Sequence, residues 1–187
     1  MEKYFKDLNE LLIATKATDN KNKRLSLYEA TEKILKSVAG QKTKGGKVIF
    51  IGNGGSASIA SHIATDFLKN CGIPAMVFND ASLITCLSND LGYEYVFQKP
   101  IEMLAEKQDI LFAISSSGKS KNILNAAQAA KKKGCLLVTL SGFAQDNPLR
   151  KMGDINFYIQ SRSYGYVEIA HLAVCHYLAD KIMEKNG

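Results

Sequence analysis

From Ile110 to Ser120 the chain reads ILFAISSSGKS, an apolar run that leads into three serines, a glycine, a lysine and a fourth serine. An apolar run without polar alternation is typical of a parallel strand that is buried on both faces. The next segment, Asn122–Lys133, has helical periodicity, so we expect a strand, a loop and a helix in that order. One N-cap serine would be purely structural, but four hydroxyls exceed what capping needs. Hydroxyls and backbone N–H groups at a helix N-terminus suit phosphate oxygens, so the stretch predicts a phosphate-binding loop.

A second loop of this kind precedes it in the chain. The apolar run Val48–Ile51 leads into Gly52-Asn-Gly-Gly-Ser56 and then a helical segment, Ala57–Lys69. Glycines let backbone N–H groups approach a ligand closely, and Ser56 can cap the helix. A plain tight turn would use the same residues. The loop lacks the G-x-G-x-x-G pattern of dinucleotide sites and the G-K-[ST] of a Walker loop, so neither ligand class is indicated.

The rest of the chain repeats the alternation of strand and helix. Further short apolar runs are Ala75–Phe78, Leu136–Leu140 and Ile155–Ile159, and a long amphipathic helix is expected over residues 167–183. This order predicts a doubly wound α/β sheet of about five parallel strands, with ligands at the carboxyl ends of the strands. Residues 1–40 read as two helices separated by the polar stretch Asp19–Arg24. We therefore expect one domain over residues 1–187: a helical hairpin for oligomer packing (1–44) and an α/β core (45–187).

Composition narrows the function classes. The 187 residues carry a formal charge of +6, but the basic residues fall in separate runs (Lys21–Arg24, Lys42–Lys47 and Lys131–Lys133) without interleaved aromatic residues. This pattern favours solvated surface over a nucleic-acid interface. No apolar run is long enough to span a membrane, and the N-terminus lacks the apolar region of a signal peptide, so a cytoplasmic protein is expected. The four cysteines are widely spaced and are interpreted as small buried hydrophobic residues.

The two loops together resemble the sugar isomerase (SIS) domain family, and most of all its phosphoheptose isomerases. The resemblance covers nearly the whole chain. It includes Asn89-Asp90 with Gly92, the segment Thr139-Leu-Ser-Gly142 and the histidines of the C-terminal helix.

The resemblance implies a flavodoxin-like three-layer sandwich that assembles as a homotetramer with active sites between subunits. It places the substrate phosphate on the two loops and the sugar on residues beside them, with Asp90 donated by a neighbouring subunit. The implied substrate contacts are Asn53, Gly54, Ser56, Asp90, Ser115, Ser116, Ser117 and Ser120. It also implies a zinc ion, for which the matching positions are His62, Asp66, Glu168 and His176.

Spacing supports part of this set. His62 and Asp66 are four residues apart and share a helix face, although an ordinary surface pair would have the same spacing. His171 and His176 are five apart and point in different directions, so one of them at most is expected to face the site. Glu168 and His176 are eight apart, a rise of about 12 Å, which makes a shared ion a stretched arrangement.

The chain departs from the family pattern at three places. Asp66 stands where the family has the glutamate that acts as base, which shortens its reach by one methylene group. Glu168 stands where the family has glutamine, so two carboxylates would offset the charge of the metal. The segment Ser163–Val167 also lacks the family's usual acid, arginine and isoleucine, which indicates a divergent branch.

The function that the resemblance implies is aldose–ketose isomerisation of sedoheptulose 7-phosphate to D-glycero-D-manno-heptose 7-phosphate, a heptose precursor for lipopolysaccharide or capsule. Asp66 would remove the proton beside the carbonyl, and His176 would transfer a proton between the two oxygens. Two alternatives stay open. One is a non-catalytic protein that binds a sugar phosphate or associates with a replication initiator, and the other is an isomerase of another sugar phosphate.

Overall fold

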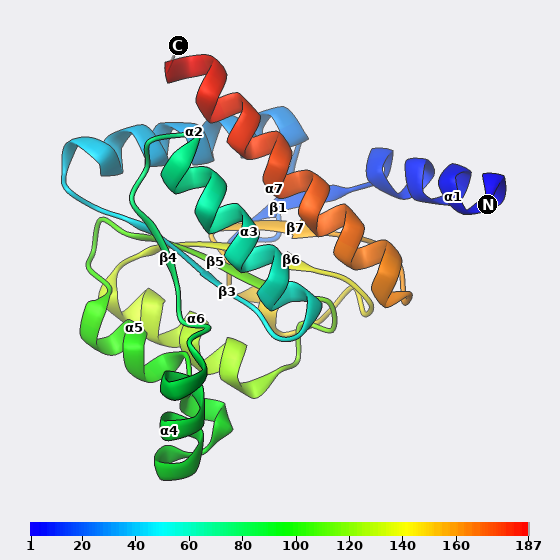
Figure 1. The fold of residues 1–187 in the computed structure, drawn as a ribbon. Helices are drawn as coiled ribbons and strands as arrows, with labels where there is room; N and C mark the ends of the chain where they lie inside the picture. The colour runs from blue at the N-terminus through cyan, green and yellow to red at the C-terminus, as the bar shows by residue number, and fades with distance from the viewer. Residues whose placement is uncertain (187) are drawn as a thin grey trace.

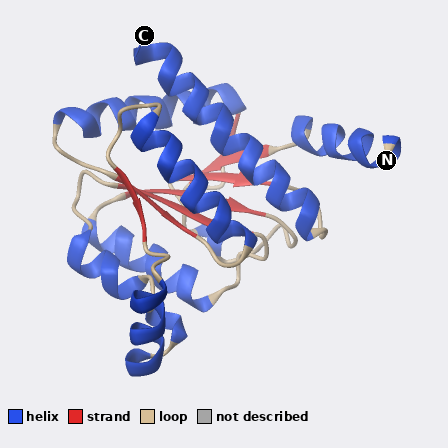
Figure 2. Ribbon diagram, viewed as in Figure 1, coloured by secondary structure: helices blue, strands red, loops and turns tan. Residues whose placement is uncertain are grey.

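A computed structural model of the chain describes residues 1–186 and contains a seven-stranded sheet between two layers of helices (Figure 1, Figure 2). The strands are β1 (Lys16–Asp19), β2 (Arg24–Leu25), β3 (Val48–Ile51), β4 (Ala75–Val77), β5 (Ile110–Ser115), β6 (Leu136–Ser141) and β7 (Ile155–Tyr158). The α-helices are α1 (Glu2–Ile13), α2 (Leu27–Thr43), α3 (Gly55–Lys69), α4 (Ala81–Leu91), α5 (Gln98–Leu104), α6 (Lys121–Lys133) and α7 (Tyr164–Asn186). Short 3₁₀ turns cover Tyr93–Tyr95 and Leu149–Lys151.

Five neighbouring strands are parallel, in the order β4-β3-β5-β6-β7. Every residue of β3, β5 and β7 is buried, which is why these strands read as continuous apolar runs. β4 lies on one side of β3, at the edge of the sheet, and β5, β6 and β7 follow in order on the other side of β3. This is the flavodoxin-like order, so the expected three-layer fold is confirmed.

The sheet has two strands more than the five expected from the sequence. β1 pairs antiparallel with β7, and β2 pairs antiparallel with β1, so the polar stretch after the first helix belongs to a β-hairpin. β1 (KATD) and β2 (RL) contain too few apolar residues to be recognised as strands in the sequence. The strand count is therefore corrected from five to seven, while the parallel core keeps five.

Two apolar clusters cover opposite faces of the sheet. In the upper part of Figure 1, α2, α3 and α7 cover one face with residues that include Ile34, Ile63 and Leu178. In the lower part, α5 and α6 cover the other face with residues that include Ile101 and Ile123. The chain thus runs from β3 to a helix on one face of the sheet, and from the neighbouring strand β5 to a helix on the other face. Such a reversal opens a crevice at the carboxyl ends of the two strands, where ligands bind in this class of sheet.

The N-terminal region contains the two expected helices, but the β1–β2 hairpin separates them. Both helices pack against α7. All residues of α1 are at least partly exposed, and the helix extends away from the body of the molecule (Figure 1). Its main anchors are the Tyr4 ring, which stacks on Tyr166 at 4.6 Å, and Asp7, which accepts a hydrogen bond from the Tyr166 hydroxyl. The helical hairpin proposed for residues 1–44 is therefore a helix, a β-hairpin and a second helix.

The start of α2 is held by a capping box. The Ser26 hydroxyl accepts a hydrogen bond from the Glu29 amide, and the Glu29 carboxylate accepts one from the Ser26 amide. These bonds to Ser26 hold the pKa of Glu29 below its usual value. Within residues 1–186, no helix has the length and apolar character needed to cross a membrane.

Candidate active site

The glycine loop and the serine loop meet at the crevice between β3 and β5. The Asn53 amide nitrogen donates to Asn122 Oδ1 at 3.0 Å, and the Asn122 amide nitrogen donates to Asn53 Oδ1 at 2.8 Å. Tyr93 adds a hydrogen bond from its hydroxyl to Asn53 Oδ1 at 3.0 Å. Asn122 is buried, so this reciprocal pair fixes the start of α6 against the loop after β3. Neither Asn122 nor Tyr93 stood out in the sequence, because Asn122 lies just outside the serine loop and Tyr93 is far from both loop motifs along the chain.

The glycine loop turns into α3 at Gly54. Gly54 is the N-cap, with φ of 53° and ψ of −124°, a conformation that a residue with a side chain adopts rarely. Ser56 lies inside the first turn of α3 and is buried, so the expectation that it caps the helix is wrong. A hollow of about 570 Å³ opens beside this loop. Its lining comes from the loop, α3, α4 and the Tyr93 turn: Gly52, Asn53, Gly54, Ala57, Ser58, Ser61, Asn79, Ile84, Tyr93 and Phe97.

The serine loop is buried at its base and open at its tip. Ser115 and Ser116 are buried, whereas Ser117 and Ser120 are half-buried. Ser120 is the N-cap residue of α6, yet in the described chain its hydroxyl makes no capping bond. That hydroxyl is therefore available to a ligand at the positive end of the helix.

Gly118 and Asn147 shape the serine loop from beneath. Gly118 has φ of +63°, and a β-carbon at this position would collide with the Asn147 amide. Asn147 is buried and donates to Ser141 Oγ at 3.1 Å and to the Ala144 carbonyl at 2.9 Å. Asn147 thus ties the serine loop to the end of β6. It is 27 residues beyond Ser120, and sequence spacing gives no sign of this role.

A cluster of His62, Asp66 and His176 lies where α3 packs on α7. Asp66 Oδ2 is 3.4 Å from His62 Nε2 and 3.5 Å from His176 Nδ1, and the two imidazole rings are 5.0 Å apart. Asn70 donates to the other Asp66 oxygen at 3.2 Å, which orients the carboxylate. One ligand atom from each of the three residues lies within 4.8 Å of the others. Two imidazoles and a carboxylate are ligand types that zinc prefers, so the three residues fit a metal ion chemically.

Two other predicted site residues lie apart from this cluster. Glu168 is on α7, two turns before His176, and its carboxylate rests against the backbone of Gly55 at the start of α3. Asp90 is exposed at the end of α4, where it accepts a hydrogen bond from Asn89 and contacts the Cys86 thiol. Glu168 is thus beside the glycine loop, whereas Asp90 makes its contacts within α4.

His171 differs from the other two histidines because it is completely buried. Burial lowers its pKa to about 4, and the backbone of Ser141 acts in the opposite direction. A neutral imidazole inside the core between α7 and β6 is a packing residue rather than a partner of His176. The expectation that only one histidine of α7 faces the site agrees with this placement.

Comparison with known proteins identifies the family. A model of the SIS domain matches residues 3–142. The phosphoheptose isomerase of Helicobacter hepaticus is 34% identical over 171 residues, which are 88% of this chain and 87% of that protein. The phosphoheptose isomerase of Proteus mirabilis is 38% identical and matches 84% of this chain and 86% of its own length. The solved structure of a phosphoheptose isomerase from Francisella tularensis superposes with a TM-score of 0.84 at 28% identity, covering 98% of this chain and 96% of that one.

The parallel sheet, the serine loop at its switch point and the match over residues 3–142 define an SIS domain, and the chain belongs to this family. Within the family it groups with the phosphoheptose isomerases, to which the resemblance of the two loops pointed.

Proposed function

We propose that the chain is an aldose–ketose isomerase that converts sedoheptulose 7-phosphate to D-glycero-D-manno-heptose 7-phosphate, a precursor of the heptose in lipopolysaccharide or capsule. The named activity of its relatives supports this substrate. The observation that supports the proposal is the Asn53–Asn122 pair, which links the glycine loop to the start of α6, directly after the serine loop. A monophosphate at the serine loop leaves the sugar chain free to reach a second group of residues.

The serine loop anchors the phosphate. Ser117 and Ser120 offer hydroxyls, and the N-terminus of α6 offers backbone N–H groups and the positive end of its dipole. Asn53 and Gly54 of the glycine loop border the hollow beside that loop, and Ser56 is buried in the first turn of α3. Binding energy gained at this remote end positions the carbonyl end of the sugar, which is where the reaction occurs.

Asp66 and His176 carry the chemistry. Asp66 acts as the base that removes the proton from the carbon beside the carbonyl, and this produces an enediol. His176 moves a proton between the two neighbouring oxygens, after which Asp66 returns its proton to the other carbon. The reaction is an internal redox exchange between two carbons, so it needs no external oxidant. The Asp66 side chain is short, but in this fold it still lies within 3.5 Å of both imidazoles.

His62, Asp66 and His176 would hold a zinc ion, with Glu168 joining them if its side chain turned away from Gly55. Bound zinc would supply Lewis-acid stabilisation of the negative oxygen that develops in the enediolate. Metal analysis of the purified protein, and of a His62→Ala variant, tests this assignment without relying on activity. The wild type is expected to contain about one zinc per chain and the variant much less.

A homotetramer completes the active site in this proposal. Asp66 is ten residues after Ser56 on α3, a rise of about 15 Å, which is longer than an extended seven-carbon sugar phosphate. The phosphate loops of one subunit therefore work with the acid–base pair of another. Asp90, which makes its contacts within α4 in a single chain, would reach the sugar in a neighbouring subunit.

The test is formation of heptose 7-phosphate by the purified protein. Asp66→Asn removes the base and is expected to lower kcat by at least about a hundredfold. Asp146→Asn makes the same change at an exposed loop position and is expected to leave kcat within about twofold. Absence of turnover in the wild type, with and without added zinc, contradicts the isomerase assignment. Retained sugar-phosphate binding in that case would favour the non-catalytic alternative.

A further inference from the structure

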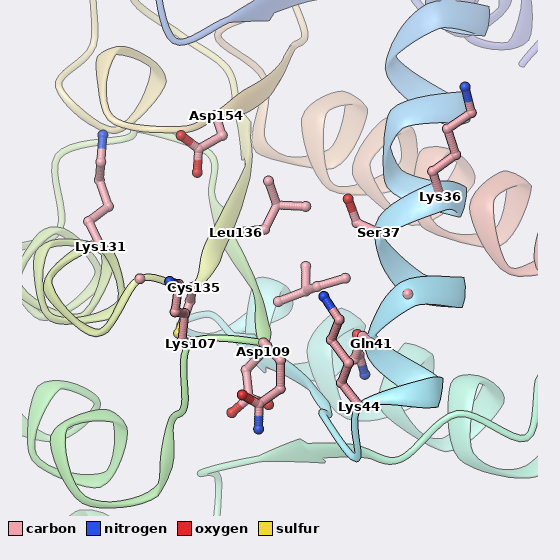
Figure 3. Close-up of a pocket in the computed structure, with 14 residues that line it drawn as sticks. Lys36, Ser37, Gln41, Lys44, Lys107, Asp109, Lys131, Cys135, Leu136 and Asp154 are labelled. Carbon is pink, nitrogen blue, oxygen red and sulfur yellow. The ribbon is translucent and has the colours of Figure 1, made fainter.

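Two basic runs that are far apart in the sequence lie together at the edge of the sheet opposite the active site. A cavity of about 550 Å³ opens there, beside Ile110 and Leu136 at the amino ends of β5 and β6 (Figure 3). Its wall includes four lysines. Lys36 lies on α2, Lys44 directly follows α2, Lys107 lies in the loop before β5, and Lys131 lies on α6. The fold thus gathers lysines that are scattered along the sequence.

The charge on this wall is unbalanced. Asp109 also lines the cavity, but its carboxylate is already bound by the Lys47 ammonium at 2.7 Å and by the amides of Lys47 and Glu106. Asp154 accepts a hydrogen bond from the Leu137 amide at 2.9 Å. Across the part of the chain that is described, Lys36, Lys44 and Lys107 make neither a side-chain hydrogen bond nor an ion pair. Unpaired ammonium groups around a concave surface attract anions.

Gln41 gives an independent indication of a ligand. It lines the same cavity and is only 2% exposed, yet among the described residues neither its amide oxygen nor its amide nitrogen has a hydrogen-bond partner. Buried polar side-chain atoms in proteins nearly always have a partner. The buried amide of Gln41 therefore offers a donor and an acceptor to a polar ligand beside the unpaired lysines.

The helix dipole explains the position of some lysines on the cavity wall but not of all of them. α2 and α6 both end at this edge, and lysines near a helix C-terminus are stabilised by the helix dipole. This accounts for Lys44 and for Lys131, whose ammonium group also donates to the Met152 carbonyl at 2.8 Å. It does not account for Lys36 two turns earlier, for Lys107 in a loop, or for the orphaned amide of Gln41.

We propose that this cavity binds a small polyanion that carries two or more phosphate groups. Several separate ammonium groups match several phosphates better than one, and a concave site of this size suits a compact molecule better than a nucleic-acid duplex. The site is distinct from the serine loop because the two lie at opposite ends of the six-residue strand β5, about 20 Å apart. The proposal does not depend on the isomerase assignment.

The test is calorimetric titration of inorganic triphosphate into the full chain carrying Ser117→Ala and Ser120→Ala, which weaken the serine loop as a competing site. In this background Lys44→Gln with Lys107→Gln is expected to weaken binding by at least about tenfold. Lys69→Gln with Lys99→Gln changes the net charge equally at exposed positions away from the cavity, and should change affinity less than about twofold. Binding is also expected to weaken as salt is raised.

Gln41→Met separates a ligand contact from a structural role. Methionine nearly preserves the length of the side chain and removes the orphaned amide, so the melting temperature should stay unchanged or rise. Triphosphate affinity should nevertheless fall several-fold. The proposal is overturned if triphosphate does not bind, if the two lysine pairs have equal effects, or if duplex DNA binds while triphosphate does not.

Discussion

Gly118 shows how strongly one residue can determine a ligand site. Its positive φ shapes the serine loop, and the Asn147 amide occupies the space that a β-carbon would need. The same amide holds the end of β6 through Ser141. Any residue other than glycine must therefore either push Asn147 away or move the loop that presents Ser117 and Ser120.

Gly118→Ala is expected to weaken sugar-phosphate binding by at least about tenfold, because the loop must shift to make room for the methyl group. Gly45→Ala is the matched control, since Gly45 also has a positive φ (71°) but has open space around it. Both variants bear the backbone strain, but only Gly118→Ala also collides with Asn147, so it should lose more stability in urea unfolding. Equal sugar-phosphate affinities in the two variants would show that the contact with Asn147 is unimportant.

His171 makes stability depend on pH. Its pKa is about 4 in the folded protein and 6.5 in the unfolded chain, so between these values the unfolded state binds more protons. The contribution of His171 to stability is therefore complete above about pH 6.5 and is lost as the pH falls toward 4. At about 1.4 kcal/mol per pKa unit, the full loss is about 3 kcal/mol.

Urea unfolding at pH 7.5 and pH 5 measures this effect. The wild type should lose stability at pH 5, and His171→Leu, which carries no titrating group, should lose less. If both proteins respond to pH equally, the dependence comes from other residues.

The four cysteines differ in how far they are buried. Cys71, Cys135 and Cys175 are buried, and burial raises the pKa of the Cys175 thiol to about 12. Cys86 on α4 is exposed, so the interpretation of all four as buried residues is wrong for this one. A disulfide reagent should therefore modify Cys86 rapidly in the native protein and the other three only after unfolding.

At the scale of the elements, α2 depends on its first turn. The reciprocal bonds of Ser26 and Glu29 satisfy backbone groups that would otherwise lack partners at the helix start. Ser26→Ala should lower the free energy of unfolding by about 1 kcal/mol, whereas Ser26→Asp, which keeps an acceptor, should lower it less. Thermal unfolding of the three proteins checks this order. A loss in Ser26→Asp as large as in Ser26→Ala would contradict the capping role.

The sequence predicts strands well where helices cover both faces of the sheet. β3 and β5 were recognised because both their faces are buried, so all their side chains except Ser115 are apolar. β1 and β2 were missed because they are short and most of their residues are polar or charged. The link between the loops was also missed, because Asn122 is 69 residues from Asn53 and only the strand order brings them together. Likewise, two separated basic runs became one cavity wall only in the folded chain.

At the scale of the whole molecule, the exposed apolar side chains of α1 bear on how chains assemble. α1 carries the exposed apolar side chains Phe5 (59%) and Ile13 (74%) on a helix that extends from the body of the chain (Figure 1). Exposed apolar side chains on a projecting helix mark an interaction surface. A second copy of the chain is the partner that the proposed tetramer provides.

Light scattering should give a mass of four 20.5 kDa chains for the wild type. Phe5→Glu with Ile13→Glu should produce smaller species and, if subunits share the active site, should also abolish isomerase activity. Met103→Glu is the control, because Met103 is as exposed (71%) but lies on α5. A wild-type monomer at micromolar concentration would contradict the tetramer.

The pairing of β1 with β7 has a consequence for how the protein is made. Residues 16–19 leave the ribosome early, but their partners in residues 155–158 are about 140 residues behind. At about 5–20 residues per second, β1 waits roughly 7–30 seconds for its second neighbour. During synthesis only the hairpin with β2 shields this strand, and the charges of Lys16 and Arg24 discourage pairing with other nascent chains. Translation speed between the codons for residues 19 and 158 should therefore influence the yield of folded protein.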